Sequence, residues 1–316
     1  MTELSLDYET FSPVDIKSEG GAKYVRHPET EPLMLGWAFD DDEPKLWIPA
    51  QGPAPAELRE GMTDPNVLKW AFNAPFEMGI TRFHTDIVVP RQSWRCTQYL
   101  SHGMAFSGSL NQILQRAGFS ERMWKSPEGS RLIRKFSVYQ PKSYKVRRWY
   151  PDTAPDDWQL FCDYCLQDVR VERALRRWLS QFDPISDEQW MGWALDQDIN
   201  DFGMPLDLEL IDTAVGLVEY RKEQLIGEMS RITGLDNPNS NQQLLPWVSE
   251  HAAPVPVSNM QATTLDWAIE RVPPGSPVQQ VLQAKRYAAQ TATTKWNSIH
   301  TMACDDGTLK GMFMPG

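Results

Sequence analysis

The segment Leu4–Thr10 constrains the fold most, because it combines a strand pattern with two closely spaced acids. Alternate side chains of a strand point to opposite faces, so the apolar residues share one face while Asp7 and Glu9 share the other. The two carboxylates would lie roughly 7 Å apart along the strand, where they repel each other unless a cation lies between them. The segment is therefore either a solvated strand face or half of a metal site.

The composition indicates a folded protein. A length of 316 residues with 41% hydrophobic side chains is enough for two domains that each bury a core. No apolar run is long enough to span a bilayer, the N-terminus does not resemble a signal peptide, and the four cysteines do not form a disulfide framework, so we expect a cytoplasmic protein without a membrane partner. The net charge of −11 argues against a protein that coats nucleic acid through its overall field, but it allows an enzyme with a local basic patch.

Hydrophobic alternation and turn residues predict an α/β first half. Residues 33–39 and 45–48 indicate two short strands that form an antiparallel sheet with the first, and 12–31 indicates a polar loop. A buried strand over 67–72 is followed directly by a helix over 74–83, a junction at which α/β folds place their chemistry. Further helices are predicted over 53–60, 95–106, 109–117 and 156–182.

Beyond Pro184 the pattern changes to long helices. Ser186 and Gln189 form a capping box at the start of the first. The chain is therefore predicted to contain a mixed α/β domain over 1–183 and a mostly α-helical domain over 184–316. The predicted helices of this second domain cover residues 186–200, 207–233, 241–251, 263–270 and 277–302.

The segment 131–149 is a candidate nucleic-acid contact, because it contains seven basic residues and no acid. Aromatic side chains are interleaved with the basic ones, and such rings can stack on unpaired bases while the cations pair with phosphates. A solvated basic loop is an equally good interpretation from the local sequence. The candidate DNA-binding residues are Arg134, Lys135, Lys142, Lys145, Arg147 and Arg148.

Two other segments place acids where a buried site could use them. They are Asn73–Glu77, after the buried strand, and Tyr164–Asp168, on the long helix. Together with Asp7 and Glu9, their acids could hold two divalent cations about 4 Å apart, and an oxygen-only ligand set favours Mg²⁺ or Mn²⁺ over zinc. Tyr164 lies one helical turn before Asp168, so its hydroxyl could orient a water molecule.

The order D-x-E, N-x-x-x-acid, Y-x-x-x-D is similar to the three exonuclease motifs in the 3′–5′ proofreading domain of family A DNA polymerases of bacteriophage and prophage type. Leu6–Phe11 resembles the first motif, Phe72–Glu77 the second and Tyr164–Val169 the third. Glu77 departs from the bacterial members, which usually have Asp there. The resemblance implies that residues 1–183 form a ribonuclease H-like exonuclease domain with a mixed sheet flanked by helices.

The same resemblance implies roles for individual residues. Asp7, Glu9 and Asp168 would be ligands of one Mg²⁺ or Mn²⁺ ion, with Asp7 bridging to a second ion and Glu77 acting there through water. Tyr164 would orient the attacking water. The residues expected to contact the terminal nucleotide of a single-stranded DNA 3′ end or a primer terminus are Thr10, Phe11 and Asn73.

The second domain resembles the start of the polymerase region. Asn200–Asp207 is similar to its entry motif, Asn237–Leu244 to its N-x-x-S-x-x-Q-L segment, and Lys285–Trp296 to the thumb helix that tracks duplex DNA. The palm and fingers that should follow are not in this sequence. We therefore expect the front half of a polymerase encoded by a phage or prophage, acting in the cytoplasm of the bacterial host and unable to add nucleotides by itself.

The leading hypothesis is a metal-dependent 3′–5′ exodeoxyribonuclease that proofreads during DNA replication. A second hypothesis is a non-catalytic DNA-binding or assembly module, in which the acidic site is vestigial and the helical domain docks a separate polymerase subunit. A third is an exonuclease of the same superfamily that trims RNA.

Overall fold

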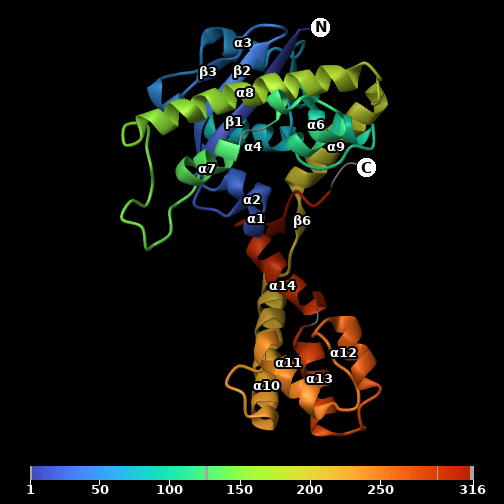
Figure 1. The fold of residues 1–316 in the computed structure, drawn as a ribbon. Coiled ribbons are helices and arrows are strands. Elements are labelled where there is room, and N and C mark those ends of the chain that lie inside the picture. Colours follow the sequence, from blue (N-terminus) through green and yellow to red (C-terminus); the bar gives the residue numbers. More distant parts are fainter. Residues whose placement is uncertain (1, 125–126, 290, 314–316) are drawn as a thin grey trace. The chain divides into compact units, whose positions relative to one another are not determined.

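The computed structural model describes residues 2–124, 127–289 and 291–313. The chain divides into two compact units (Figure 1). The first unit consists of Met1–Met204 together with Cys304–Gly316, and the second consists of Pro205–Ala303. The first unit is mixed α/β and the second is helical, as the sequence predicts.

A five-stranded sheet forms the centre of the first unit, in the order β3-β2-β1-β4-β5. β1 (Glu3–Phe11) lies in the middle, antiparallel to β2 (Glu31–Phe39) and parallel to β4 (Leu68–Ala71). β3 (Lys45–Trp47) pairs antiparallel with β2, and β5 (Trp94–Cys96) pairs parallel with β4. The four predicted strands, β1 to β4, are all present. The sheet is mixed because β4 and β5 pair in parallel on one side of β1, whereas β2 and β3 pair antiparallel on the other.

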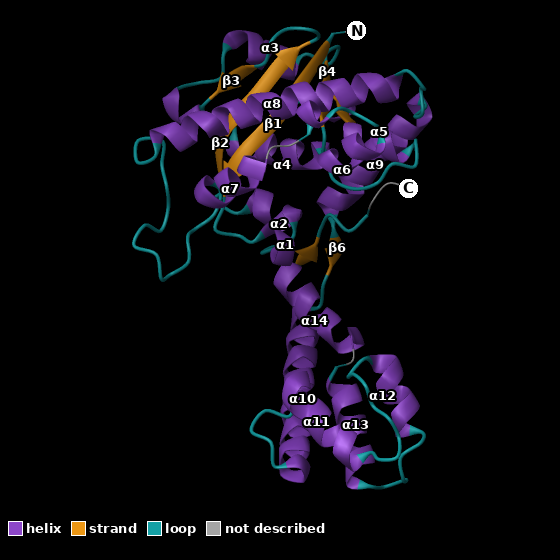
Figure 2. Ribbon diagram, viewed as in Figure 1, coloured by secondary structure: helices purple, strands orange, loops and turns teal. Residues whose placement is uncertain are grey.

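Helices cover both faces of this sheet (Figure 2). The long helix α8 (Pro155–Ser180) crosses the face that carries the polar side chains of β1, since Arg176 on α8 donates to Ser5 Oγ at 3.3 Å. The helix α4 (Ala74–His84) lies on the opposite face, where the Thr81 hydroxyl donates to the Tyr8 hydroxyl at 3.3 Å. The polar face of β1 is therefore largely covered by α8, and Asp7 on it is half-buried.

The remaining helices of the α/β part are short, and two predictions for it are wrong. Residues 12–31 are not a single polar loop, because the apolar residues Tyr24 and Val25 are buried and order two helices. The helix predicted over 95–106 begins only at Thr97, since the residues before it pair as β5. The helices are α1 (Ile16–Glu19), α2 (Gly21–Arg26), α3 (Ala56–Thr63), α5 (Thr97–His102), α6 (Leu110–Arg116) and α7 (Pro127–Phe136), with 3-10 turns η1 (Pro49–Gln51), η2 (Arg91–Ser93) and η3 (Glu121–Met123).

The boundary between the units lies at residue 204 and not at the predicted 183, because α9 (Asp187–Phe202) packs with the α/β part. Trp190 and Trp193 of α9 are buried in its core, and Trp190 makes an edge contact with Trp70 of β4 at 5.6 Å between ring centroids. The capping box predicted at Ser186 and Gln189 starts this helix.

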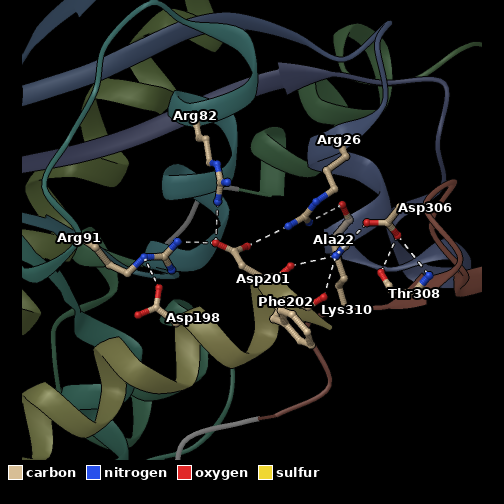
Figure 3. Close-up of polar contacts among 10 residues, drawn as sticks. All are labelled: Ala22, Arg26, Arg82, Arg91, Asp198, Asp201, Phe202, Asp306, Thr308 and Lys310. Carbon is tan, nitrogen blue, oxygen red and sulfur yellow. Dashed lines mark hydrogen bonds and ion pairs between the residues drawn. The ribbon is translucent and has the colours of Figure 1, made fainter. Parts of the chain in front are cut away.

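Ion pairs fix the C-terminal end of α9 (Figure 3). The Asp201 carboxylate binds the guanidinium groups of Arg26, Arg82 and Arg91, at 2.8, 3.0 and 2.5 Å. Lys310, which follows the short strand β7 (Thr308–Leu309), donates to the main-chain oxygen of Asp201 at 2.9 Å. This network joins α2, α4, η2 and the returning chain to α9, so the unit continues beyond Pro184.

The second unit is a helical assembly with its own core. Lys285 is buried on α13, and its ammonium group donates to the main-chain oxygen of Asn239 at 2.6 Å, which ties the predicted N-x-x-S-x-x-Q-L segment to this helix. The helix predicted over 277–302 is two helices, and residue 290 lies outside the described residues. The helices are α10 (Leu208–Thr233), α11 (Asn241–His251), α12 (Ala262–Ile269), α13 (Pro277–Ala288) and α14 (Thr291–Met302), and the two-residue strand β6 (Met204–Pro205) precedes them. Across the described parts of both units, no helix combines the length and apolarity needed to cross a membrane.

Candidate metal centre

Three of the four predicted metal-binding acids meet at the centre of the first unit. Asp7 and Glu9 lie on β1 and Asp168 lies on α8, and one carboxylate oxygen of each lies within 4.8 Å of the other two. Glu9 and Asp168 are buried, whereas Asp7 is half-buried. The structure thus brings together side chains separated by about 160 positions in the sequence.

A close approach of α8 to the sheet makes this meeting possible. Gly36 of β2 pairs with Asp7, and a Cβ atom at Gly36 would lie only 2.9 Å from Val169 Cγ2 and 3.0 Å from Cys165 Sγ. Real Cβ contacts are rarely this short, so a side chain at this position would push α8 away from β1. The Cys165 thiol also donates to the main-chain oxygen of Asp7 at 3.5 Å. Gly36 therefore sets the depth at which Asp168 faces Asp7.

Glu77 is placed at the first turn of α4 but is not one of the three clustered acids. Its side chain is buried, and its Oε2 atom has no hydrogen-bond partner. Burial and the nearby charge of Asp7 raise the pKa of Glu77 well above its usual value, although backbone hydrogen bonds from Glu77 and Tyr8 offset part of this effect. The carboxylate of Glu77, the predicted fourth ligand, is therefore close enough for the charge of Asp7 to raise its pKa, but it is not part of the three-acid cluster.

A buried charge network extends the cluster along α8, and the sequence interpretation did not assign it to the site. Glu172 lies one helical turn after Asp168, where it accepts a hydrogen bond from Thr97 and lies 3.6 Å from Arg176. Burial raises the pKa of Glu172, and Arg176 and Thr97 lower it only in part. The i, i+4 spacing from Asp168 was the available sequence signal.

The chemistry of the cluster fits a hard divalent cation. Its donors are carboxylate oxygens, which suit Mg²⁺ or Mn²⁺. Burial and the charges of Asp7, Glu9 and Asp168 raise the pKa of the neighbouring Cys165 thiol well above the usual value, which favours its neutral form. Buried like charges at this distance are costly unless a cation offsets them.

The side chains predicted to meet the terminal nucleotide differ in accessibility. Thr10 and Phe11 are both buried, and the Thr10 hydroxyl is hydrogen-bonded to the hydroxyl of Tyr24 at 2.7 Å. Asn73 is exposed at the N-cap of α4, without a side-chain cap hydrogen bond. Tyr164 is half-buried on α8, where its ring stacks on Phe161 at 6.3 Å between centroids.

The predicted basic segment contains two kinds of residue. Lys135 pairs with Asp157 at 2.5 Å, and Arg148 pairs with Glu31 while its guanidinium group lies 3.6 Å from the centre of the Phe11 ring. These two side chains are engaged in packing the segment against the first unit. Among the candidate DNA-binding side chains, those that stay exposed to solvent are Arg134, Lys142, Lys145 and Arg147.

Comparisons with known proteins find similarity to DNA polymerases. Over 317 aligned residues, 99% of this chain, it is 34% identical to a DNA polymerase of Bacillus phage SP02, of which it covers 48%. The motif-based resemblance to phage-type family A DNA polymerases is confirmed. No protein-family model matches the chain.

A solved structure supports the same fold. The chain is similar to the POL domain of Pol1 from M. smegmatis in complex with a DNA primer-template and dNTP, with a TM-score of 0.54 and 12% identity over 98% of this chain and 48% of that one. At this identity the likeness establishes the fold alone. The chain spans about half the length of both relatives, and neither comparison supports the separate polymerase subunit considered from the sequence.

Proposed function

We propose that the chain is the 3′–5′ exonuclease part of a phage-type family A DNA polymerase, with the α/β unit forming a ribonuclease H-like domain and two divalent cations acting at its centre. The observation that carries this proposal is the meeting of Asp7, Glu9 and Asp168 within 4.8 Å. These are acids of the first and third exonuclease-like motifs, and the mixed sheet flanked by helices is the architecture which that domain requires.

The protein side chains have distinct tasks in this mechanism. Bound Mg²⁺ or Mn²⁺ would lower the pKa of a water molecule and offset the charge of the phosphodiester oxygens. Asp7, Glu9 and Asp168 would hold the cations, and Glu77 would contribute through water. Tyr164, one turn before Asp168, orients the attacking water with its hydroxyl. Because α8 covers this face of the sheet, the reacting groups lie in a partly desolvated site.

DNA would reach this site along exposed basic side chains. Arg134, Lys142, Lys145 and Arg147 are exposed to solvent and can pair with phosphates, and the exposed rings of Tyr139 and Tyr144 can stack on unpaired bases. The net charge of −11 is compatible with this role because the contact is local. The helical unit corresponds, in this proposal, to the thumb-like start of the polymerase region.

The decisive test is the degradation of a 5′-labelled single-stranded oligonucleotide in the presence of Mg²⁺ or Mn²⁺. The expected result is a ladder of products shortened from the 3′ end, abolished by a chelator. Asp7→Asn, which keeps the side-chain shape but removes the charge, should eliminate the ladder. The matched control is Asp163→Asn on α8, where an exposed carboxylate lies outside the cluster. Intact DNA with the wild-type protein, or equal loss in both variants, contradicts the proposal.

The burial of Glu77 favours a second candidate function. With its pKa raised and its carboxylate outside the cluster, Glu77 in this state is poorly suited to hold a cation. A non-catalytic DNA-binding module would then bind the oligonucleotide with strong salt dependence and leave it intact in either metal. Parallel assays with DNA and RNA oligonucleotides distinguish a deoxyribonuclease from an enzyme that trims RNA.

A further inference from the structure

The ring of Tyr164 is packed against a glycine of a different helix. Gly129 is buried on α7, and a Cβ atom built there would lie 2.2 Å from Cε2 and 2.7 Å from Cζ of Tyr164. Real Cβ atoms do not approach other atoms so closely, so the ring can occupy this position only because residue 129 has no side chain.

Aromatic packing also restricts the ring. Tyr164 stacks on Phe161, which is fully buried and stacks in turn on Phe136 at the end of α7, at 5.5 Å between centroids and 12° between planes. The first and last turns of α7 therefore both contribute to the packing around Tyr164. A ring displaced by a new methyl group at residue 129 cannot relax toward Phe161 without disturbing this buried stack.

A charged contact holds α7 in place on α8. The Asp157 carboxylate accepts two hydrogen bonds from Arg131, at 2.8 and 3.0 Å, and pairs with Lys135 at 2.5 Å. A bidentate pair of this kind fixes orientation as well as distance. Asp157 lies two helical turns before Tyr164, so the contact anchors α7 on the same side of α8 that presents the ring.

We propose that α7 is a positioning element for Tyr164, in which Gly129 makes room for the ring and the Asp157 contact keeps Gly129 against it. This inference rests on the proposed exonuclease function, since it assigns the ring hydroxyl a task in orienting water. Gly129 and Asp157 are positioning residues and do not touch the substrate. The segment 131–149 includes the end of α7 and continues beyond it. DNA bound to this segment would therefore contact the helix that positions the Tyr164 ring.

A double-mutant cycle tests the proposal with the intact chain. The variants are Gly129→Ala, Tyr164→Ala and their combination. The control is Gly192→Ala, which makes the same change in a helix of the same unit where a Cβ atom meets nothing within 4 Å. The measurements are kcat and KM on a single-stranded oligonucleotide, the pH profile of kcat, and the midpoint of thermal unfolding.

We expect Gly129→Ala to lower kcat about tenfold with KM changed less than about twofold, because the ring is displaced while DNA binding is retained. In the Tyr164→Ala background the same change should alter kcat by less than about twofold. Equal losses in both backgrounds, or no loss in either, overturn the proposal. Gly192→Ala should leave kcat and KM unchanged.

A second variant keeps the proposal testable if Gly129→Ala does not fold. Asp157→Asn leaves the space at Gly129 unchanged but weakens the contact that holds α7, so kcat should fall about threefold with Tyr164 present and stay unchanged with Tyr164→Ala. An inactive wild-type protein would contradict the proposed function itself. An active wild type with additive effects would contradict only the positioning by α7.

Discussion

Asp7 and Asp201 are both half-buried aspartates of the first unit, yet the side chains around them carry opposite charges. Asp201 is surrounded by Arg26, Arg82 and Arg91, whose guanidinium groups lie within 3.0 Å of its carboxylate. Asp7 lies instead within 4.8 Å of the carboxylates of Glu9 and Asp168. The region around Asp201 offsets the charge of its carboxylate with arginine side chains, whereas the region around Asp7 brings three carboxylates together.

The pKa directions express the same contrast. Burial alone would raise the pKa of Asp201, but the hydrogen bond and charge of Arg91, together with Arg26 and Arg82, lower it below its usual value. The pKa of Glu77 is raised by burial and further by the charge of Asp7. A region that stabilises its own carboxylate has a structural task, whereas a region that accumulates like charge is suited to receive a cation.

The largest expected effect is on activity at the acidic cluster. Asp168→Asn should lower the exonuclease rate by at least about a thousandfold, since it removes a charge that holds the cations. In a chelator, the same variant should unfold at an equal or higher temperature than the wild type, because a like-charge contact is lost. Thermal unfolding with EDTA and oligonucleotide degradation with Mn²⁺ measure the two halves of this prediction. Strong destabilisation in EDTA would make Asp168 a structural residue.

The opposite pattern is expected at the compensated site. Asp201→Asn should lower the free energy of unfolding by about 1–2 kcal/mol. This is less than for the loss of a fully buried ion pair, because the groups are partly exposed. The folded-state pKa of Asp201 is lowered, so this stabilisation is present above its usual value of 3.8 and is lost as the pH falls through the folded-state pKa. Urea unfolding at pH 7 and in acid checks both statements. An unchanged stability at pH 7 would show that the network contributes nothing.

A smaller change of opposite sign is expected at Glu77. Its folded-state pKa is raised, so its contribution to stability is full below the usual value of 4.5 and is lost as the pH rises through the folded-state pKa. Glu77→Gln should therefore stabilise the metal-free protein at neutral pH and have little effect in acid. Urea unfolding in EDTA at pH 4 and pH 8 tests this, and a variant that is less stable at pH 8 would contradict it.

The smallest effect is expected at Asp198, which pairs with Arg91 at 2.9 Å but has a side chain 61% exposed. Asp198→Asn should change the free energy of unfolding by less than about 0.5 kcal/mol, as for other exposed ion pairs. It is the matched control for Asp201→Asn, because both changes remove a carboxylate partner of the same arginine. Equal effects of the two variants would show that Asp201 contributes no more to stability than the exposed Asp198.

Much of the fold follows from local sequence patterns. The alternation at Leu4–Thr10 predicts β1, and the i, i+3, i+4 pattern predicts the long helix α8, since the apolar side chains of each element must share a face. The motif order also selects Asp7, Glu9 and Asp168, whose carboxylates lie together in the structure. The loop predicted over 12–31 failed because Tyr24 and Val25 are buried by distant residues, which no local pattern reveals.

The sequence by itself thus determined β1, the long helix α8 and the candidate acids, because periodicity and residue type are local properties. Only the tertiary structure decided that Glu77 stands apart from the other three acids, that α9 belongs to the first unit, and that Lys135 and Arg148 are engaged in ion pairs. Each of these outcomes depends on contacts between distant segments. The absence of a side chain at Gly36 allows α8 to approach the sheet closely, and three arginines from separate elements bind Asp201 near the end of α9.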